Sequence, residues 1–410
     1  MDAMAKRRGE IRVLHVIARL NVGGPARILP HVLHDLRRSG VSVLLASGSV
    51  EPGEADMSDL AKRLGIPTAT VPQMRRSLSP LSDLRAYRRV RSLIRSFRPD
   101  VVHTHTAKAG ALGRRAAWAE GTDLIVHTYH GHVFDGYFDP IRTRLFLGIE
   151  RRLASVTHRI CVLSRQQKRE LLERYRIGTE DRYAVIPPGV APVERDGDRD
   201  GSESAPLPLG WEGRTVVGIV GRIVPVKNHG LFLDAARRIL NSAPETRFLV
   251  VGDGPLRGAL ESRVRREGWS DAIRFLGWRR DLARLYEVMD IVILTSKNEG
   301  VPVSLLEAME FGIPVVSTDV GGVADFVSHG AEGFLAPSGD AEGLSRSVLR
   351  LIEDPGLRRR MGNAGTIRVA SGTGPEAQAR ALLDLYRDGL GIGLEGSPAR
   401  VSADGEPAEA

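Results

Sequence analysis

Residues 215–240 read TVVGIVGRIVPVKNHGLFLDAARRIL, and they contain one complete structural unit. The β-branched run 215–220 predicts a buried strand, and Gly221 predicts a tight turn after it. Apolar residues then recur at helical spacing over 231–240, which predicts an amphipathic helix. A strand, a polar turn and a helix in this order form the unit from which parallel sheets are built.

The same order recurs on both sides of this unit. After it, the sequence predicts strands and helices in alternation at 247–251, 256–267, 273–276, 282–289, 291–295, 303–311 and 314–317. Before it, the predicted elements are at 11–17, 26–39, 41–46, 84–97, 101–104, 124–128, 143–154, 159–163 and 165–175. This alternation predicts an α/β protein with two doubly wound, Rossmann-like domains, and the cleft between two such domains is the expected ligand site.

The alternation stops between residues 187 and 211, where Pro, Gly, Asp and Ser predominate. We therefore expect an N-terminal domain and a C-terminal domain joined by a linker or surface loop. A helix near 377–390 is expected to pack at the junction of the domains. The last residues are rich in Gly, Pro, Ala and Glu, which predicts a disordered tail. The expected limits are 1–190 for the N-terminal domain, 191–213 for the linker, 214–376 for the C-terminal domain and 391–410 for the tail.

The composition is that of a globular protein, with 42% hydrophobic and 26% charged residues in a chain of 410. Cys161 is the only cysteine, which excludes an intramolecular disulfide and a cysteine-based zinc site. The sequence contains no apolar run of ~20 residues that could cross a membrane and no secretion signal, so a cytoplasmic protein is expected. The net charge of +8 predicts an anionic partner. Aromatic residues are too few and too scattered to form a stacking platform for nucleic acid.

Eight arginines lie in the segment Arg75–Arg98. From residue 84 onward the apolar residues form one face of the predicted helix, and the arginines occupy the others. Two interpretations remain open: an ordinary solvated helix surface, or a basic surface that docks on anionic phospholipid. The second would place the protein peripherally at the inner face of a membrane, close to a lipid-linked acceptor.

Glu299 and Glu307 are the two carboxylates of the stretch NEGVPVSLLE, eight positions apart. The stretch follows a predicted strand, so Glu299 is expected at the carboxyl edge of the sheet, where open α/β folds bind ligands. Pro302 suits the first helical position, and the amides of Val303 and Ser304 would then face the cleft as a phosphate site. The alternative is that Glu299 caps the helix and Glu307 is a solvated helix residue.

Arg222 and Lys227 follow the predicted strand at 215–220, which places them at the corresponding edge of the same sheet. The guanidinium fork of an arginine and the compact charge of a lysine can together bind a diphosphate. Single basic residues in loops are more often solvated without a partner. A basic loop beside an acidic helix start favours the binding interpretation.

Several motifs of the C-terminal half resemble, in this order, those of the retaining glycosyltransferases of family 4, which have the GT-B fold: Gly221-Arg222 through Lys227-Asn228, Gly252-Asp253-Gly254-Pro255, Phe275-Leu276-Gly277, and Glu299 through Glu307. In the N-terminal half, three motifs are similar to members that build bacterial surface polysaccharides: Asn21-Val22-Gly23-Gly24, HTHTAKAG from His103, and HTYHG from His127. The resemblance extends over nearly all of residues 11–390.

The resemblance implies a role for individual residues. The family residues that match Arg222 and Lys227 bind the nucleotide diphosphate and stabilise the leaving phosphate. The match to Glu307 binds the ribose hydroxyls. The matches to Glu299 and His130 contact the transferred sugar from opposite sides of the cleft.

The resemblance implies further donor-binding positions. The glycine loop lets the N-terminal domain approach the sugar, one segment borders the base, and the helix start completes the site. These positions are Gly23 and Gly24, Gly277 and Trp278, and Val301, Pro302, Val303 and Ser304. One motif departs from the family pattern: Gly321-Gly322-Val323-Ala324-Asp325 stands where members more often have Pro-Glu at the last two positions, so no role is carried over to Asp325.

The resemblance implies an enzyme that transfers a sugar from a nucleotide-diphosphate sugar, which we expect to be a UDP-sugar. The expected acceptor is a glycan or an undecaprenyl-diphosphate-linked polysaccharide precursor. The expected stereochemical outcome is retention of the anomeric configuration. The resemblance also implies that no metal and no cofactor are needed, which fits the positive charge that arginine, lysine and a helix start supply. Five histidines could suggest a zinc site, but they lack the acidic partners of a typical one: His103, His105, His127, His130 and His132. Two alternatives remain: a sugar-nucleotide epimerase of similar architecture, and a non-catalytic basic module for nucleic acid or membrane.

Overall fold

The computed structural model describes residues 10–21, 23–50, 56–75, 79–131, 134, 139–193, 210–279, 281–372 and 374–392. Most of the expected linker, 194–209, and the expected tail from residue 393 onward lie outside the described residues.

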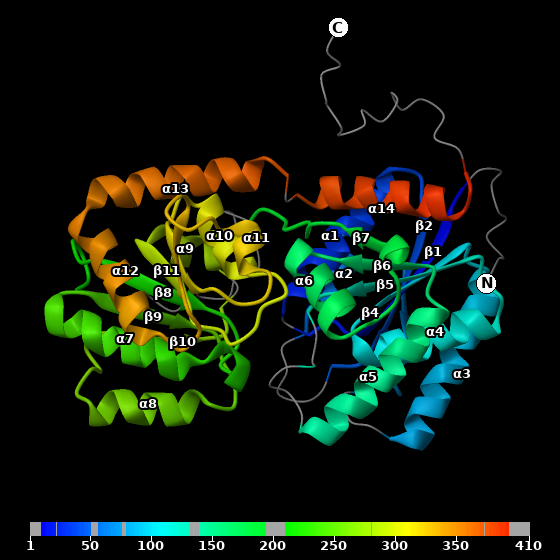
Figure 1. The fold of residues 1–410 in the computed structure, drawn as a ribbon, viewed down its shortest axis with the longest axis horizontal. Helices are drawn as coiled ribbons and strands as arrows, with labels where there is room; N and C mark the ends of the chain where they lie inside the picture. Colours follow the sequence, from blue (N-terminus) through cyan, green and yellow to red (C-terminus); the bar gives the residue numbers. More distant parts are fainter. Residues whose placement is uncertain are drawn as a thin grey trace, which may run out of the picture.

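Two parallel sheets form the centres of two lobes that lie side by side (Figure 1). The first sheet has the order β3-β2-β1-β4-β5-β6-β7. Its strands are β1 (Arg12–Arg19), β2 (Ser42–Gly48), β3 (Thr68–Thr70), β4 (Val101–His105), β5 (Leu124–Tyr129), β6 (Arg159–Val162) and β7 (Tyr183–Val185). The second sheet has the order β10-β9-β8-β11-β12-β13. Its strands are β8 (Val216–Val220), β9 (Arg247–Val251), β10 (Ile273–Gly277), β11 (Ile291–Leu294), β12 (Val315–Thr318) and β13 (Gly333–Ala336).

Helices cover both faces of each sheet. Those of the N-terminal lobe are α1 (Gly24–Arg38), α2 (Ser58–Arg63), α3 (Pro80–Phe97), α4 (Ala107–Ala119), α5 (Pro140–Ser155) and α6 (Arg165–Arg169), which continues as one π-helical turn, Glu170–Arg174. Those of the C-terminal lobe are α7 (His229–Ser242), α8 (Arg257–Arg266), α9 (Leu282–Glu287), α10 (Val303–Glu310), α11 (Val323–Phe326), α12 (Ala341–Glu353) and α13 (Pro355–Ala370). The last helix is α14 (Pro375–Gly389).

The strand order reverses once in each sheet, between β1 and β4 in the first and between β8 and β11 in the second. The chain therefore winds outward in one direction and then in the other, and this confirms the prediction of two doubly wound α/β domains. Loops that leave the carboxyl ends of adjacent strands at such a reversal diverge, and a crevice opens between them. The glycine loop follows β1, the loop with Arg222 and Lys227 follows β8, and Glu299 follows β11, so these motifs lie at the two reversals.

Four of the described helices were absent from the sequence-based prediction: the short helices α2 and α11, and the longer helices α4 and α13. The two longer ones show why. Helix α4 has the sequence AKAGALGRRAAWA, so alanines and glycines together with Arg114 form its buried face, and the periodicity of large apolar residues is lost. Helix α13 contains three glycines and several arginines, which lower the apparent helix propensity. Both helices are stabilised by close packing, which Gly113 of α4 and Gly362 of α13 permit because a Cβ at either position would collide with a neighbouring element.

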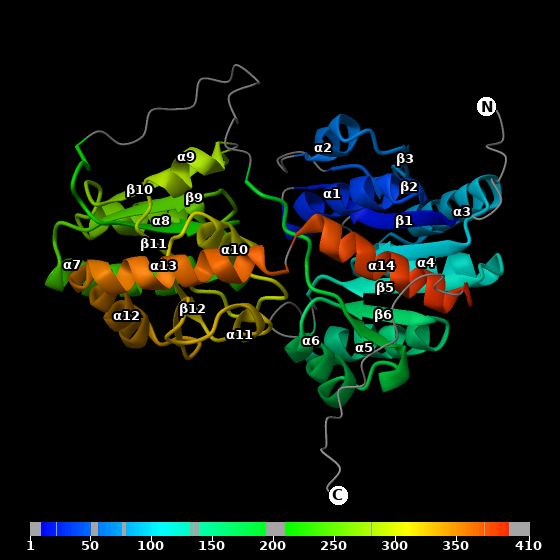
Figure 2. The ribbon, with the colours of Figure 1, turned by 90° about the horizontal axis from the view of Figure 1, so that it is seen from above.

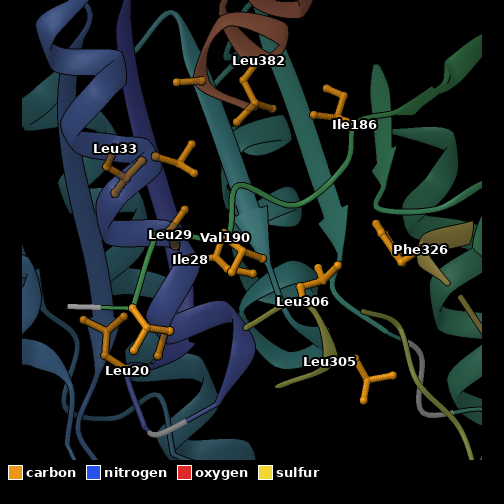
Figure 3. Packing of buried hydrophobic residues seen from close by; sticks show 14 of the residues in the cluster. Leu20, Ile28, Leu29, Leu33, Ile186, Val190, Leu305, Leu306, Phe326 and Leu382 are labelled. Atoms are coloured by element: carbon orange, nitrogen blue, oxygen red, sulfur yellow. The ribbon is translucent and has the colours of Figure 1, made fainter. Parts of the chain in front are cut away.

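The two lobes share one hydrophobic cluster. Figure 3 shows buried side chains of α1, of the segment around Ile186 and Val190, and of α14 in the N-terminal lobe near Leu305, Leu306 and Phe326 of the C-terminal lobe. Helix α13 lies on the C-terminal lobe, whereas α14 crosses back and packs on α1 (Figures 1 and 2). The hydroxyl of Tyr386 on α14 is 2.6 Å from Nδ1 of His103 on β4, which ties the C-terminal helix to the first sheet.

None of the described helices combines the length and the apolar character needed to span a lipid bilayer.

Candidate active site between the lobes

The loop after β5 meets the loop after β11 where the lobes face each other. A Cβ on Gly300 would collide with the carbonyl oxygen of His130 and lie 2.8 Å from Cα of Gly131. Only glycine permits so close an approach of the two backbones. The predicted residues His130 and Glu299 are therefore carried on loops that touch across the boundary between the lobes.

The glycine loop after β1 approaches the start of α10. A Cβ on Gly24 would lie 3.3 Å from Cγ2 of Val303, which is closer than most side-chain contacts. Gly23 has an extended backbone (φ 164°) and room for a side chain, so the close approach depends on Gly24 alone. The glycine loop of the N-terminal lobe therefore lies against the start of α10 in the other lobe.

Asp325 also lies at the boundary. Its Oδ2 accepts a hydrogen bond from the backbone N–H of Gln166 in α6, with an N···O distance of 2.9 Å. Four residues earlier in the same motif, Gly321 has φ +52°, and a Cβ there would collide with the carbonyl oxygen of Glu299. The motif that departs from the family pattern therefore joins the two lobes and supports the loop that carries Glu299.

Lys227 and Glu299 form an ion pair, with Nζ 2.6 Å from Oε1. Glu299 is 8% exposed, and the hydroxyl of Ser296 donates to the same carboxylate oxygen. The hydroxyl of Thr295 donates to the carbonyl oxygen of Lys227 at 3.1 Å, so the loops after β8 and β11 are held together. Two residues that are 72 positions apart in the chain are thus brought into contact.

Arg222 lies on the same loop as Lys227 but is exposed, and its side chain forms no hydrogen bond or ion pair with a described residue. The structure therefore does not include Arg222 in the Lys227–Glu299 pair. Its position one residue after Gly221, at the carboxyl end of β8, leaves its guanidinium accessible from solvent.

Glu307 is 2% exposed and is bound from both lobes. Its Oε1 is 2.7 Å from Nη1 of Arg27 on α1, and its Oε2 accepts from the hydroxyl of Tyr286 on α9 at 2.8 Å. The pKa of Tyr286 is raised well above its usual value, mainly by burial and also by the negative charge of Glu307. The hydroxyl of Tyr286 therefore keeps its proton and remains a donor. The interpretation of Glu307 as a solvated helix residue is wrong.

The start of α10 differs from the prediction in two details. Pro302 is the N-cap residue and Val303 the first helical residue, because ψ of Pro302 is 67° and is not helical. The N–H of Val303 donates to the carbonyl of Val301 at 3.0 Å. A local turn therefore uses one of the two amides that were expected to face a phosphate, and among the described residues the N–H of Ser304 has no hydrogen-bond partner.

Gly277 and Trp278 lie at the end of β10, two strands from β8. Gly277 has φ +68°, and its carbonyl accepts from the N–H of Gly252 at 2.8 Å. The side chain of Trp278 is 41% exposed. An exposed aromatic ring at the carboxyl end of a strand is suited to contact a planar base.

His130 begins a chain of three hydrogen-bonded imidazoles. Its Nε2 is 2.9 Å from Nδ1 of His105, and Nε2 of His105 is 3.0 Å from Nδ1 of His15. Burial lowers the pKa of His130 to about 4 and that of His15 to about 3, so both rings are neutral at pH 7.

The sequence-based prediction missed several residues of this region: Arg27, His15, Tyr286 and Ser296. Arg27 and Tyr286 lie on helices that follow other strands, so their approach to Glu307 depends on the packing of α1 and α9. His15 could have been found from the doubly wound order, which pairs the first strand with the strand of His103. In the structure these strands are parallel, and His15 lies beside His103.

His15, His103 and His105 form a group of ring nitrogens within 4.8 Å of one another, close enough for a metal ion. His103, however, makes hydrogen bonds through both ring nitrogens, to the hydroxyls of Tyr386 and Thr128 at 2.6 Å each. Both nitrogens of His105 are also engaged. The group is therefore satisfied largely by hydrogen bonds within the protein.

Comparison with known families covers both lobes. Residues 23–189 match the glycosyl transferase 4-like domain, and residues 207–368 match the glycosyl transferases group 1. A D-inositol 3-phosphate glycosyltransferase of Kribbella flavida is 31% identical over 311 residues, which is 70% of this chain and 71% of the relative. A UDP-Gal:alpha-D-GlcNAc-diphosphoundecaprenol alpha-1,3-galactosyltransferase of Escherichia coli is 29% identical over 327 residues, 78% of this chain and 83% of the relative.

Solved structures of low sequence identity share the fold. HepE of Anabaena, crystallised with UDP-glucose, superposes with a TM-score of 0.74 at 20% identity, covering 92% of this chain and 100% of HepE. Sucrose-phosphate synthase of Thermosynechococcus elongatus gives the same TM-score, 0.74, at 20% identity over 92% of this chain and 98% of the synthase. The chain therefore belongs to the glycosyltransferases that combine a 4-like N-terminal domain with a group 1 C-terminal domain in the GT-B fold.

Proposed function

We propose that this glycosyltransferase moves a sugar from a UDP-sugar to a lipid-diphosphate-linked polysaccharide precursor, with retention of anomeric configuration and without a metal ion. The observation that carries the proposal is the ion pair of Lys227 with the buried Glu299, opposite His130 at the contact between the lobes. The Escherichia coli relative is named for a donor and an acceptor of these two classes.

The pair supports sugar transfer because its two members suit different parts of one substrate. A lysine ammonium stabilises the charge that develops on a leaving diphosphate. A buried carboxylate accepts hydrogen bonds from sugar hydroxyls. Arg222, exposed on the same loop as Lys227, is available to the diphosphate. Glu307 lies eight positions after Glu299, where a ribose diol can replace or share the hydrogen bond that Arg27 now makes.

Retention of configuration is proposed to follow from attack on the front face. The acceptor hydroxyl attacks the anomeric carbon on the side from which UDP leaves, and an oxygen of the departing phosphate takes the hydroxyl proton. Glu299 positions the sugar and does not attack it, because its carboxylate is already bound by Lys227 and Ser296. Contact between the lobes excludes water and protects the donor from hydrolysis.

Independence of metal ions is part of the proposal because this chain offers cationic side chains, Lys227 and Arg222, at the diphosphate position. The carboxylates nearby, Glu299 and Glu307, are each bound to a cationic side chain. Activity unchanged by a chelator such as EDTA is the result expected; restoration of a chelated enzyme only by Mg²⁺ or Mn²⁺ would overturn this part.

Nucleotide binding is tested by thermal unfolding with a panel of nucleotides and nucleotide sugars. UDP at 100 times its dissociation constant is expected to add about 2.7 kcal/mol to the free energy of unfolding. In Glu307→Gln, which weakens the proposed ribose contact, the same UDP concentration should add clearly less. If no nucleotide diphosphate raises the melting temperature of the unmodified protein, the proposed donor class is wrong.

Transfer is distinguished from epimerisation by its need for an acceptor. UDP release from the UDP-sugar that binds is expected to increase at least tenfold when a membrane extract containing undecaprenyl-diphosphate-linked sugars is added. Interconversion of two UDP-sugars at the same rate with and without acceptor would instead identify an epimerase.

We also propose that the layer formed by α3, α4 and α5 docks on an anionic membrane. These helices cover the sheet face opposite α1 and α14 (Figures 1 and 2). Arg91 and Arg95 of the predicted basic segment are paired with Glu120, so part of its charge is neutralised. The layer nevertheless exposes six large apolar side chains and further arginines: Leu81, Leu84, Trp118, Ile141, Leu145 and Ile149, with Arg85, Arg88, Arg89, Arg142 and Arg144.

Apolar side chains interspersed with arginines match the chemistry of an anionic lipid surface, since each arginine near such a surface contributes about 1 kcal/mol. The triple variant R85Q/R88Q/R89Q is expected to bind phosphatidylglycerol vesicles at least tenfold more weakly in co-sedimentation. The variant R346Q/R360Q/R380Q, which removes three exposed arginines elsewhere, serves as the charge-matched control and should bind as the unmodified protein does. Equal binding by both triple variants would refute the docking surface.

A further inference from the structure

Arg27 is a cationic residue at a place in its helix that disfavours positive charge. It lies at the end of the first turn of α1, where its backbone N–H donates to the carbonyl of Gly23. The free N–H groups at the start of a helix create a positive potential, which favours carboxylates and disfavours cations. The interaction that offsets this cost comes from the other lobe, where Oε1 of Glu307 lies 2.7 Å from Nη1 of Arg27. The contact between the lobes therefore accounts for the place of Arg27.

The carboxylate of Glu307 can be reached from solvent only past the side chain of Arg27. On one side, Oε2 accepts from the hydroxyl of Tyr286, which is 1% exposed and packs against the ring of Phe311. On the other side, Oε1 is bound by Arg27, whose side chain is 29% exposed. A ligand that approaches Glu307 from solvent therefore meets the guanidinium first.

The backbone of α1 is held in place beside α10. Ile28 and Leu29 of α1 belong to the same buried cluster as Leu305 and Leu306 of α10 (Figure 3). Withdrawing α1 would expose these side chains to water. Rotating the long side chain of Arg27 into solvent leaves the cluster intact and breaks only a partly solvated ion pair, which is a weak interaction. Side-chain rotation, and not separation of the lobes, is therefore the movement that frees Glu307.

We propose that Arg27 competes with the ribose of the nucleotide for Glu307 and thereby sets the affinity for the donor and for UDP. The inference rests on the proposed function, which identifies the ligand as a nucleoside diphosphate. With Arg27 in place, Glu307 is 2% exposed and offers almost no surface to a diol. When the guanidinium rotates away, both hydroxyls of a ribose can donate to the carboxylate.

The competition changes the affinity for nucleotides by a defined factor. The apparent dissociation constant equals the intrinsic constant divided by the fraction of molecules in which Arg27 has left Glu307. UDP, the product, carries the same ribose as the donor, and release of a tightly bound product limits the turnover of many enzymes. Arg27 weakens nucleotide binding at the ribose and leaves the separate pair of Lys227 with Glu299 unchanged. It therefore limits inhibition by UDP without altering the groups proposed to act on the diphosphate.

Calorimetry with two ligands tests the competition. Arg27→Ala and Arg27→Gln both remove the competing charge, and glutamine keeps more of the side-chain volume in case the alanine variant folds poorly. Both variants are expected to bind UDP about tenfold more tightly than the unmodified protein, which corresponds to Arg27 occupying Glu307 in about nine of ten molecules. Inorganic pyrophosphate, which has no ribose, should show no such gain.

Two control variants separate this competition from a general effect of charge. Arg38→Ala removes an exposed arginine at the other end of α1, and it should bind UDP as the unmodified protein does. In the background of Glu307→Gln, the guanidinium no longer has a carboxylate to occupy. Adding Arg27→Ala to Glu307→Gln should therefore leave the UDP affinity of that variant unchanged.

The outcomes distinguish this inference from the proposed function. If the Arg27 variants bind UDP no more tightly than the unmodified protein, the competition is overturned and the proposed function stands. An equal gain for pyrophosphate would overturn the competition in the same way, because it would show a general effect of charge. If neither the unmodified protein nor the variants bind any nucleoside diphosphate, the proposed function and the inference fail together.

Discussion

Replacing Lys227 with alanine is expected to lower kcat by at least about 100-fold while the protein remains folded. The lysine is the cationic group closest to Glu299, and removing one preorganised group that stabilises developing negative charge commonly costs 10²–10³ in rate. The KM for the donor should change much less than kcat, because the charge on the leaving diphosphate is largest in the transition state.

Glu299→Ala is expected to lower kcat by a similar factor, because the sugar loses the carboxylate that holds it. The two substitutions should not be additive. Each single variant leaves the other member of the pair without its partner in a largely buried site, at a cost of roughly 1–3 kcal/mol in the free energy of unfolding. The double variant K227A/E299A should therefore be more stable than the sum of the two single effects implies. Urea unfolding of the four proteins measures this difference.

Lys297→Ala is the matched control, because Lys297 is an exposed lysine in the loop that carries Glu299. It should leave both kcat and the unfolding midpoint near those of the unmodified enzyme. Normal product formation by Lys227→Ala or Glu299→Ala would remove the pair from the proposed mechanism. An equal loss of activity in Lys297→Ala and Lys227→Ala would show that activity depends on the overall positive charge of this region and not on the Lys227–Glu299 pair.

Acidification from pH 7 to pH 5 is expected to destabilise the protein by several kcal/mol. Burial lowers the pKa of His15 to about 3. The pKa of His229 is lowered to about 4, mainly by burial and also by the positive charge of Lys227. In the unfolded chain both histidines titrate near 6.5. Between pH 6.5 and about 4 the unfolded state therefore binds more protons than the folded state, and stability falls as the pH falls.

The magnitude follows from these pKa values. Each of the two histidines contributes a loss of roughly 2 kcal/mol between pH 7 and pH 5, so the pair costs roughly 4 kcal/mol. Burial also lowers the pKa values of His103, His105, His127 and His130, which adds to the loss in the same direction. A loss of this size is a large part of the 5–15 kcal/mol that stabilises a typical domain.

Chemical denaturation at a series of pH values measures the effect. His229→Leu provides the internal comparison, because both ring nitrogens of His229 are buried without hydrogen-bond partners among the described residues. Removing the imidazole of His229 should reduce the slope of the unfolding free energy against pH between pH 4 and 6.5. The reduction should correspond to about one fewer proton bound on unfolding. An unfolding free energy that stays constant from pH 7 to pH 5 would show that these histidines are not buried in neutral form.

The order of strands and helices was largely predictable because it depends on local pattern. β-Branched runs and helical periodicity located most elements within a few residues of their observed limits. The elements that were missed fall into two groups. The strands β3, β7 and β13 and the helices α2 and α11 are too short to show a clear period. The longer helices α4 and α13 pack glycines against close neighbours, and the benefit of that packing is invisible in a window of sequence.

The candidate site was predictable where a residue lies directly after a strand. Parallel strands bring their carboxyl ends to one edge, so the positions of Lys227 and Glu299 in the C-terminal lobe and of His130 in the N-terminal lobe followed from the alternation. The expectation of a free amide at Val303 was wrong, because a local turn uses its N–H. A turn of a few residues determines which N–H groups remain available for a ligand.

The sequence by itself determined the alternation of elements, the two doubly wound lobes and the edge of each sheet that carries the polar motifs, since all three follow from periodicity and from the geometry of parallel strands. Only the tertiary structure decided that Arg27 reaches Glu307 from the opposite lobe, that Asp325 joins α6, and that His15 stands at the end of the imidazole chain behind His130. These contacts join residues far apart in the chain, and their distances depend on how helices and lobes pack, which no local pattern encodes.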